Sequence, residues 1–294
     1  MLNWLKRIAT PDSREQLVEN EKQIERLTGR LGAYNRTANE SVETQTHTRP
    51  RDQTPPTEAK VERLRGRLVT PRGTPNALAG TFAQTCVIAV ACQKGGSGKT
   101  TIAAHLAVQA SAAGQGPVSL VDTDPQGSLG EWWGVRHDDS LALATMKLDD
   151  LVANPAPLRS STAAIAIIDT PPALTASIEQ VIAIADLVLI PARPSPHDLR
   201  AIGATVKMAR KAGKPFLFVV NGVAPRANIT AEAVAALSAH GRVAPVILYQ
   251  RTDFAASMID GRTVMETAPA GRSAQEIAEL WKYVYAQISI RAAA

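Results

Sequence analysis

The chain has 294 residues, of which 45% are hydrophobic and 4% aromatic, and its formal net charge is +5. This length suits one large domain with an appendage, and the core must consist mainly of Ala, Val, Ile and Leu. The sequence contains no apolar run of the roughly 18 residues that cross a bilayer, and its two cysteines are too few for a disulfide framework. We therefore expect a cytoplasmic protein with reduced thiols, and not a membrane-spanning or disulfide-rich secreted protein.

The first 80 residues differ in composition from the rest of the chain. A short amphipathic helix is expected over about residues 12–34, where apolar residues recur at heptad spacing. Two heptads are too few to predict a coiled coil, so a lone amphipathic helix remains an alternative. Residues 35–75 are rich in Thr, Arg, Pro and Gln, which is typical of a disordered linker. The sequence thus divides into a largely disordered N-terminal extension, 1–80, and a main domain, 81–294.

From residue 81 onward, short apolar runs alternate with helix-forming stretches. Strands are expected at Val87–Ala91, Val118–Val121, Ala164–Ile168, Leu187–Ile190, Phe216–Val220 and Pro245–Tyr249. Helices are expected near Thr100–Ala113, Ser177–Ala185, Asp198–Ala212, Thr230–His240 and Ser273–Ile288. This alternation predicts an α/β fold with a mostly parallel sheet flanked by helices, with ligands at the carboxyl ends of the strands.

A glycine-rich loop lies between the first expected strand and the first expected helix. It reads Lys94-Gly95-Gly96-Ser97-Gly98-Lys99-Thr100-Thr101. The N–H groups of such a loop can surround a phosphate at a helix N-terminus, with Lys99 on the outer phosphates and the Thr100 hydroxyl on Mg²⁺. The loop departs from the usual G-x-x-x-x-G-K-S/T pattern, because Gln93 replaces the first glycine. It also carries a second lysine, Lys94, whose repulsion with Lys99 requires an anion between them or side chains that point apart.

Two acidic runs follow expected strands further along the chain. Asp122 and Asp124 come after the second strand, and Asp169 comes after the third. A carboxylate at a strand end beside a phosphate loop can hold Mg²⁺ through water or orient an attacking water. A single such aspartate is often only a turn cap, but two runs in order after a phosphate loop favour a catalytic site. Trp132 and Trp133 come soon after the first run, and packing in a core or interface is favoured over stacking on a base.

The pattern K-G-G-x-G-K-T-T, followed by the two acidic runs, resembles the deviant Walker A ATPases of the ParA/MinD family. The likeness covers residues from about 84 to 290 and is greatest to ParA-type partition and positioning ATPases. It implies a P-loop NTPase fold with ATP and Mg²⁺ as cofactors. It also implies a homodimer in the ATP state, in which Lys94 reaches the nucleotide of the other subunit. Without the resemblance, Lys94 reads as a solvated loop lysine.

The resemblance further implies a role for each polar residue of the site. Lys99 would neutralise phosphate charge within its own subunit, Lys94 would do so in trans, and Asp124 would orient the hydrolytic water. It assigns Mg²⁺ coordination to Thr100, Asp122 and Asp169. Asn221, after the fifth expected strand, would contact the adenine, although alone it reads as a turn residue before glycine. The chain lacks the Asn-Lys-x-Asp run of GTPases at this point, which favours ATP.

Basic residues suggest where DNA would bind. Arg200, Lys207 and Arg210 fall near one face of an expected helix, so they could contact phosphates without reading sequence. Arg251 and Arg262 lie further along, where ParA-type proteins often place residues that contact DNA. The alternative is that these side chains form an ordinary solvated charged surface.

Together these features predict a ParA-like ATPase that dimerises on ATP binding, holds DNA nonspecifically and hydrolyses ATP when stimulated by a ParB-like or other partner. The cargo would be a plasmid, a chromosome or a protein assembly, and the ATP state would be nucleoid-associated. A MinD-like membrane-associated ATPase is one alternative, although residues 281–291 contain few of the basic residues expected of a membrane-binding helix. A nonenzymatic, ATP-bound scaffold acting through the N-terminal extension is another.

Overall fold

The computed structural model describes residues 84–292, apart from 146, 160, 173–175 and 225–228. The described residues form one seven-stranded sheet in the order β3-β2-β4-β1-β5-β6-β7, and every strand pair is parallel. The strands are β1 (Cys86–Val90), β2 (Val118–Asp122), β3 (Leu141–Thr145), β4 (Ile165–Asp169), β5 (Leu187–Ala192), β6 (Phe216–Val223) and β7 (Val243–Tyr249). This is the α/β fold of a P-loop NTPase, as the sequence predicts.

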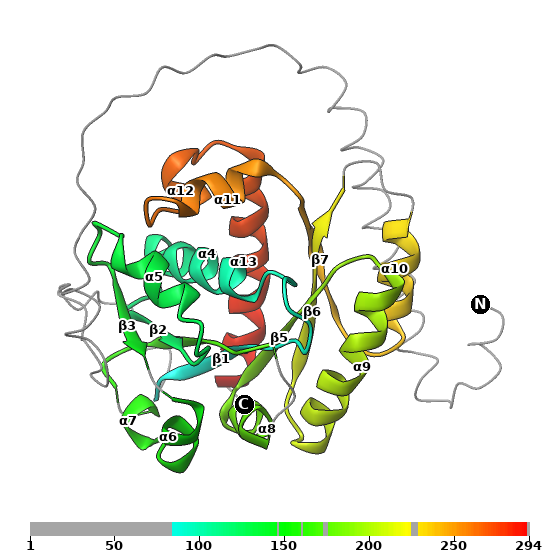
Figure 1. Cartoon of the computed structure of the whole chain (residues 1–294), viewed down its shortest axis with the longest axis horizontal. Coiled ribbons are helices and arrows are strands. Elements are labelled where there is room, and N and C mark those ends of the chain that lie inside the picture. Colours follow the sequence, from blue (N-terminus) through cyan, green and yellow to red (C-terminus); the bar gives the residue numbers. More distant parts are fainter. Residues whose placement is uncertain (1–83, 146, 160, 173–175, 225–228, 293–294) are drawn as a thin grey trace, which may run out of the picture.

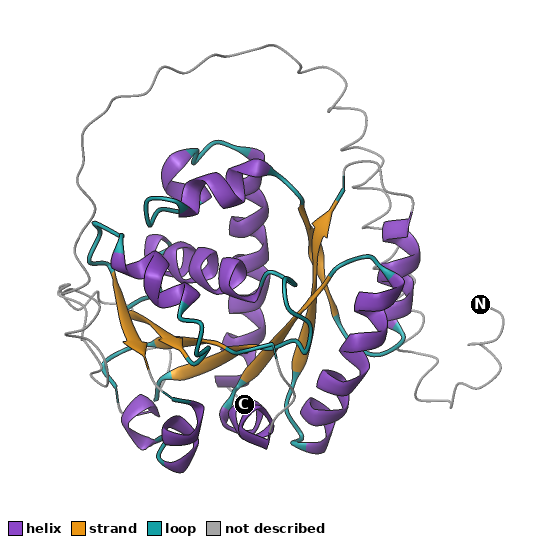
Figure 2. Cartoon of the chain, in the orientation of Figure 1, coloured by secondary structure: helices purple, strands orange, loops and turns teal. Residues whose placement is uncertain are grey.

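Helices cover both faces of the sheet (Figure 1; Figure 2). One face carries α4 (Lys99–Ala112), α5 (Ser128–Gly134), α11 (Thr252–Met258), α12 (Val264–Thr267) and α13 (Arg272–Ala292). The other face carries α6 (Leu148–Ala153), α7 (Ala156–Arg159), α8 (Ala176–Ile184), α9 (Pro196–Lys211) and α10 (Ile229–Ser238). Each face therefore encloses its own hydrophobic layer, and the sheet is the wall between the two layers.

The central strands are buried along their whole length. Within β1, Ile88 and Val90 face the layer that contains α4, whereas Val87 and Ala89 face the layer that contains α8 and α9. This alternation explains why the sequence of β1 is a continuous apolar run, since both of its faces need apolar side chains. Helix α4 packs onto the sheet largely through buried alanines, which lets its backbone approach closely. The start of α4 is thereby fixed beside the carboxyl end of β1.

The expected elements correspond closely to the observed ones. All six expected strands are confirmed, and the five expected helices correspond to α4, α8, α9, α10 and α13. The sequence reasoning missed strand β3, a five-residue edge strand whose alternation of Leu and Ala was its only signal. It also missed α5, α6, α7, α11 and α12, which have four to seven residues each and are too short for helical periodicity to stand out. The predicted N-terminal helix and linker lie outside the described residues.

Two further expectations concern cysteines and membranes. Cys86 and Cys92 are both buried and free, in agreement with the expectation of unpaired thiols. Burial raises the pKa of the Cys86 thiol to about 12, so it behaves as an inert core residue. Across the described residues, no helix combines the length and apolar character that crossing a bilayer requires.

A buried histidine joins the first helix of the domain to its C-terminal part. The Val264 N–H donates to His105 Nε2 at 3.4 Å, so the ring proton must sit on Nδ1, which lies 2.8 Å from the Thr101 carbonyl oxygen. The ring also meets Phe254 edge-on, with a centroid separation of 5.2 Å. Burial lowers the pKa of His105 to about 4. His105 is therefore a neutral structural residue that links α4 to α11 and α12.

The depressed pKa of His105 predicts that acid destabilises the fold. Between its ordinary value of about 6.5 and the folded value, the unfolded chain takes up a proton that the folded chain does not, so the free energy of unfolding falls as pH drops. The full effect at pH 4 is about 3 kcal/mol. We expect His105→Gln to be less stable than the wild type at pH 7 but to lack this part of the acid dependence. Urea unfolding of both chains from pH 7 to pH 4 measures the difference, and parallel pH curves would contradict the assignment.

Candidate functional site

The glycine loop turns sharply between β1 and α4. Gly96 and Gly98 have φ values of +70° and +92°, and residues that carry a Cβ atom rarely adopt such backbone angles. A Cβ atom on Gly98 would also lie 2.2 Å from Asn221 Nδ2, so a larger residue there would have to displace the Asn221 side chain from the loop. Gly98 is the N-cap of α4, and no side chain caps the helix. The first N–H groups of α4 are thus left for another acceptor, which is the arrangement that favours an anion.

The polar side chains of the loop fit a bound phosphate group. Ser97 Oγ is buried and has no hydrogen-bond partner among the described residues. Lys99 is 7% exposed, and its ammonium donates a long hydrogen bond of 3.4 Å to the Lys94 carbonyl oxygen, so the side chain curls back over the loop. An unsatisfied hydroxyl, a buried cation and an uncapped helix N-terminus converge on one place. The residues present therefore suit the nucleotide phosphates that the loop sequence predicts.

The two lysines of the loop point in different directions. Lys94 Nζ lies 2.9 Å from Asp198 Oδ1, in the first turn of α9, and its side chain is 41% exposed. Lys99 instead folds over the loop, as described above. The repulsion that their proximity in sequence would cause is avoided because the side chains diverge. Only Lys99 is placed to act on an anion held in its own loop.

The strand order brings both acidic runs to the loop. Strand β4 lies between β1 and β2, and the register pairs Asp169 with Val90 on one side and with Asp122 on the other. Thr170 Oγ1 donates to the Val90 carbonyl oxygen at 2.9 Å, and Thr123 Oγ1 donates to the Asp169 carbonyl oxygen at 2.6 Å. These two threonines, which the sequence reasoning did not single out, tie the three strand ends together. The one sequence signal for this role is that each threonine directly follows a strand-end aspartate.

Asp169 and Thr100 form the best candidate for a cation site. Thr100 Oγ1 donates to Asp169 Oδ2 at 2.6 Å, whereas Asp169 Oδ1 is buried with no partner among the described residues. Burial raises the pKa of Asp169 to about 7, and the nearby carboxylates of Asp122 and Asp124 add to the effect. A cation at this point would stabilise the charged form of the buried carboxylate. Within the described part of the chain, no three His, Cys, Asp or Glu side chains are grouped as a metal cluster.

The acidic run after β2 bonds to backbone N–H groups as well as lying near the site. Asp122 is 1% exposed, and its two oxygens accept from the Asp124 N–H at 3.1 Å and the Gly130 N–H at 2.8 Å. Burial raises the pKa of Asp122 despite these bonds. Asp124 is half-buried, and its Oδ1 accepts from the Gln126 N–H at 3.0 Å. Asp122 thus fixes the turn that holds Asp124 near the loop and joins it to α5.

Asn221 also reaches the loop, from the end of β6. Its Nδ2 donates to the Ser97 carbonyl oxygen at 2.8 Å, and its amide packs against Gly98. The side chain therefore lies at the candidate site and does more than form a turn. Its contact with an adenine remains a prediction.

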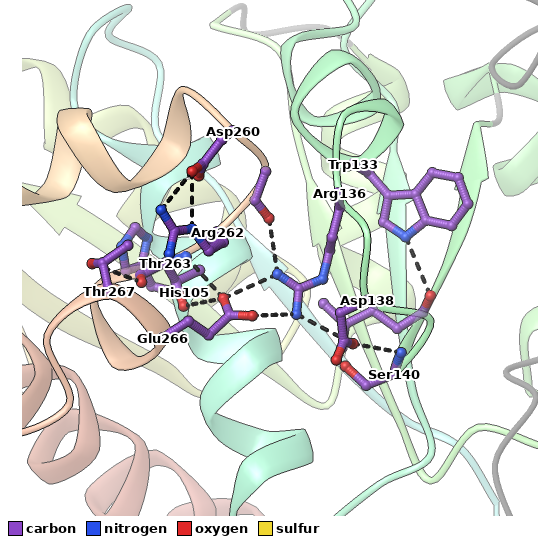
Figure 3. A network of polar contacts seen from close by, with 12 residues as sticks. His105, Trp133, Arg136, Asp138, Ser140, Asp260, Arg262, Thr263, Glu266 and Thr267 are labelled. Carbon is purple, nitrogen blue, oxygen red and sulfur yellow. Dashed lines mark hydrogen bonds and ion pairs between the residues drawn. The ribbon is translucent and has the colours of Figure 1, made fainter. Parts of the chain in front are cut away.

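A buried polar network anchors the far end of α5 (Figure 3). Arg136 is 2% exposed, binds both oxygens of Glu266 at 3.0 and 2.8 Å, and donates to the Gly261 carbonyl oxygen at 2.8 Å. A Cβ on Gly261, where φ is +77°, would lie 2.5 Å from the Arg136 backbone. Glu266 also accepts from the N–H and hydroxyl of Thr263, both at 2.8 Å, which caps α12. The sequence reasoning missed this network entirely.

The tryptophan pair belongs to the same region and is structural. Trp132 and Trp133 are 4% and 7% exposed, which confirms core packing over base stacking. The Trp132 indole donates to the Arg262 carbonyl oxygen at 3.0 Å, and that of Trp133 donates to the Leu141 carbonyl oxygen at 3.2 Å. These bonds hold α5 against β3 and the loop before α12.

The five basic residues proposed for DNA do not form one surface. Arg200 and Lys207 are exposed on α9, and Arg210 on the same helix donates to the His240 carbonyl oxygen at 2.7 Å. Arg251 is 15% exposed and binds Glu276 through two hydrogen bonds of 2.7 Å, while Arg262 pairs with Asp260 at 2.6 Å. Helix α9 and the α11–α12 region pack on opposite faces of the sheet (Figure 1). Only the α9 group keeps side chains that are not committed to a carboxylate in this way.

The chain is similar to known nucleotide-binding proteins across the residues that form the site. The profile of the CobQ/CobB/MinD/ParA nucleotide binding domain matches residues 88–264, which include the loop, both acidic runs and Asn221. The "maintenance of carboxysome distribution protein A" of Halothiobacillus neapolitanus is 33% identical over 201 residues, covering 64% of this chain and 91% of that protein.

Solved structures show the same fold at lower identity. The ATP complex of an McdA variant from Cyanothece aligns with a TM-score of 0.60 at 20% identity, covering 69% of this chain and 96% of the other. The Mg-ADP complex of MinD from Pyrococcus horikoshii aligns with a TM-score of 0.56 at 20% identity, covering 70% and 98%. Both neighbours are nucleotide complexes, and what they share with this chain is the fold.

The ion pair inside the network of Figure 3 predicts a large loss of stability when its carboxylate is neutralised. Glu266→Gln keeps the shape of the side chain and its ability to cap α12, but takes from the buried Arg136 guanidinium its closer carboxylate and leaves it the more exposed Asp138 at 3.3 Å. We expect the free energy of unfolding to fall by about 2 kcal/mol, because Asp138 compensates the guanidinium in part. The matched control is Glu179→Gln, which neutralises the exposed partner of Lys211 and should cost less than about 1 kcal/mol. Equal losses in urea unfolding would contradict the structural role of the network.

Proposed function

We propose that this chain, which belongs to the CobQ/CobB/MinD/ParA family of nucleotide-binding domains, is an ATPase that acts as a dimerising switch. The observation that carries the proposal is the divergence of the two loop lysines. Lys99 lies over its own loop, while Lys94 points away from it and is 41% exposed. A lysine that is part of a phosphate loop but directed outward is suited to a nucleotide held by a second subunit.

The residues of the site divide the chemistry of phosphoryl transfer to water. The loop from Gly95 to Thr101 and the Lys99 ammonium hold the phosphates of ATP, and Lys94 adds positive charge from the other subunit. Thr100 and Asp169 hold Mg²⁺, which when bound neutralises phosphate charge. Asp124, at the rim of the site, orients the attacking water. Asp122 holds Asp124 in place by accepting from its N–H, and it also helps to organise the groups around the Mg²⁺ ion. Asn221 contacts the adenine.

The proposed cycle also involves DNA and a partner protein. In the ATP state the homodimer binds DNA nonspecifically through Arg200 and Lys207, with Arg210 at the edge of the same helix, so the protein is nucleoid-associated in the cytoplasm. Arg251 and Arg262 contribute less, because each pairs with a carboxylate. A ParB-like or other partner then stimulates hydrolysis and releases the dimer. The cargo that fits best is a protein assembly, since the relative from H. neapolitanus is named for carboxysome distribution.

The dimer predicts a specific effect of Lys94→Ala. The variant should retain nucleotide binding, because Lys99 and the loop are intact, but lose the ATP-dependent dimer and most of its ATP turnover. Sedimentation with ATP, together with steady-state turnover with and without DNA, measures both properties. Lys282→Ala, which removes an exposed lysine of α13, serves as the control and should match the wild type.

Two results would count against this function. A Lys94→Ala dimer as stable as that of the wild type would refute the role of Lys94 in trans. A wild-type chain that binds ATP but shows no turnover under any of these conditions would instead favour a nonenzymatic scaffold.

The α9 surface predicts how DNA retention depends on charge. Arg200→Glu combined with Lys207→Glu should weaken binding of a random duplex at least about tenfold near 0.1 M salt, and lower the slope of log affinity against log salt by about 2. Fluorescence anisotropy of the ATP-bound protein measures this. The control, Lys147→Glu combined with Lys282→Glu, makes the same change in net charge at exposed positions elsewhere. If the α9 variant retains DNA as well as this control, the DNA surface lies elsewhere, first at Arg251 and Arg262.

A further inference from the structure

The order of the strands fixes the direction in which a bound nucleotide crosses the sheet. The glycine loop follows β1, and the candidate cation site at Asp169 lies at the end of β4, which is the neighbour of β1 on one side (Figure 1). Because Mg²⁺ is held by the outer phosphates of a nucleotide, those phosphates belong on the β4 side of the loop. The ribose and the base then extend toward the other neighbour of β1, which is β5, and toward β6 beyond it.

An arginine lies at the carboxyl end of β5, on this course. The register pairs the last residue of β5, Ala192, with Val220 of β6. The residues that follow in the two segments, Arg193 and Asn221, therefore come side by side at the edge of the sheet. Ala192 and Val220 both face the layer that contains α8 and α9, so the next residue of each segment is directed to the opposite face. That face carries the loop and α4, and the Asn221 amide does reach the loop there.

The stem of this arginine lies over a glycine next to Asn221. Gly222 has a φ of +64°, and a Cβ atom built on it would lie 3.1 Å from Arg193 Nε, 3.5 Å from its Cγ and 3.6 Å from its Cδ. The arginine thus occupies the space that a larger residue at position 222 would need, and Nε, which is part of the guanidinium, takes part in the packing. Since Arg193 is nevertheless exposed, one side of its guanidinium is set against β6 and the other is open to a ligand.

The charge of Arg193 is not paired with a carboxylate among the described residues. Asp198, the acidic residue nearest to it along the chain, forms its close contacts with Lys94 and Ser195. Burial raises the pKa of Asp198 and these two contacts lower it, with Arg193 adding only the effect of a charge at longer range. An exposed guanidinium that is supported on one side and has no bonded acid within the described fold is available to a ligand.

We propose that Arg193 is a nucleotide-binding residue, and that its guanidinium stacks on the base of the nucleotide held in the loop of the same subunit. The inference rests on the proposed function and adds to it a residue that supports the base beside Asn221. Stacking suits this position because the plane of a guanidinium matches the π face of a base. The phosphates, by contrast, already have Lys99 and the free N–H groups of α4 on the far side of the loop.

The test separates a contact with the base from a contact with the phosphates. Arg193→Ala should weaken binding of ADP to the full chain about tenfold, because the stacked base loses its support. Binding of tripolyphosphate, which carries no base, should be unchanged. Isothermal titration calorimetry in the presence of Mg²⁺ measures both ligands. Arg291→Ala is the matched control, because it removes an exposed arginine from the last turn of α13 and should leave both affinities unchanged.

A second variant distinguishes the plane of the side chain from its charge. Arg193→Lys keeps the positive charge but has no planar group, so it should recover little of the lost ADP affinity. Full recovery in this variant, together with weakened binding of tripolyphosphate by Arg193→Ala, would overturn the inference, because the contact would then be with a phosphate. Unchanged ADP affinity in Arg193→Ala would overturn it as well.

The remaining outcomes separate this inference from the function on which it rests. A wild-type chain that binds neither ADP nor tripolyphosphate would contradict the proposed nucleotide site, and the inference with it. A chain that binds ADP with the expected dependence on Arg193, but never turns over ATP, would support the inference and contradict the proposed ATPase. If Arg193→Ala does not fold by circular dichroism, Arg193→Gln keeps a smaller planar group and should weaken ADP binding about threefold. No loss in that variant would overturn the inference.

Discussion

The parallel pairing of β2, β4 and β1 is the constraint on which the candidate site depends. Because neighbouring parallel strands end at the same edge of the sheet, Asp122, Asp169 and the glycine loop meet although they are far apart in sequence. The hydroxyls of Thr123 and Thr170 bond across these strand ends and fix their relative height. Without this alignment the loop would still turn, but its hydroxyl at Thr100 would have no carboxylate to bind.

The buried charges at this edge of the sheet determine which ligands can bind there. Asp122 and Asp169 are both almost fully buried, and burial raises the pKa of each. Lys99 is the buried cation of the loop and opposes the shift at Asp169 only in part. A site with closely spaced buried carboxylates, an uncapped helix N-terminus and a lysine is balanced best when a divalent cation and a phosphate enter together. The geometry is therefore more consistent with a bound Mg²⁺–nucleotide pair than with either component alone.

What the sequence could predict depended on whether the signal was local. The strands, the long helices and the loop could be predicted because each is a contiguous run of residues. The acidic runs could be predicted because each directly follows an apolar strand. Arg136 and Glu266 are 130 residues apart in the chain, and the sequence around one of them gives no indication that it pairs with the other. The same holds for Lys94 and Asp198. The short strand β3 was missed for a different reason, since five alternating Leu and Ala residues do not separate strand from helix.

The two distant pairs connect the candidate site to opposite faces of the sheet. Through Asp122, the first acidic run is bonded to the start of α5, and through Arg136 the segment that follows α5 is fixed to Gly261 and Glu266 beside α12. Through Lys94, the loop is bonded to α9 on the other face. The first connection runs through the buried side chains of Asp122 and Arg136, so it fixes the turn around Asp124 from within the fold. The second ends on a lysine whose side chain is 41% exposed, so this connection lies at the surface of the fold, within reach of a second subunit.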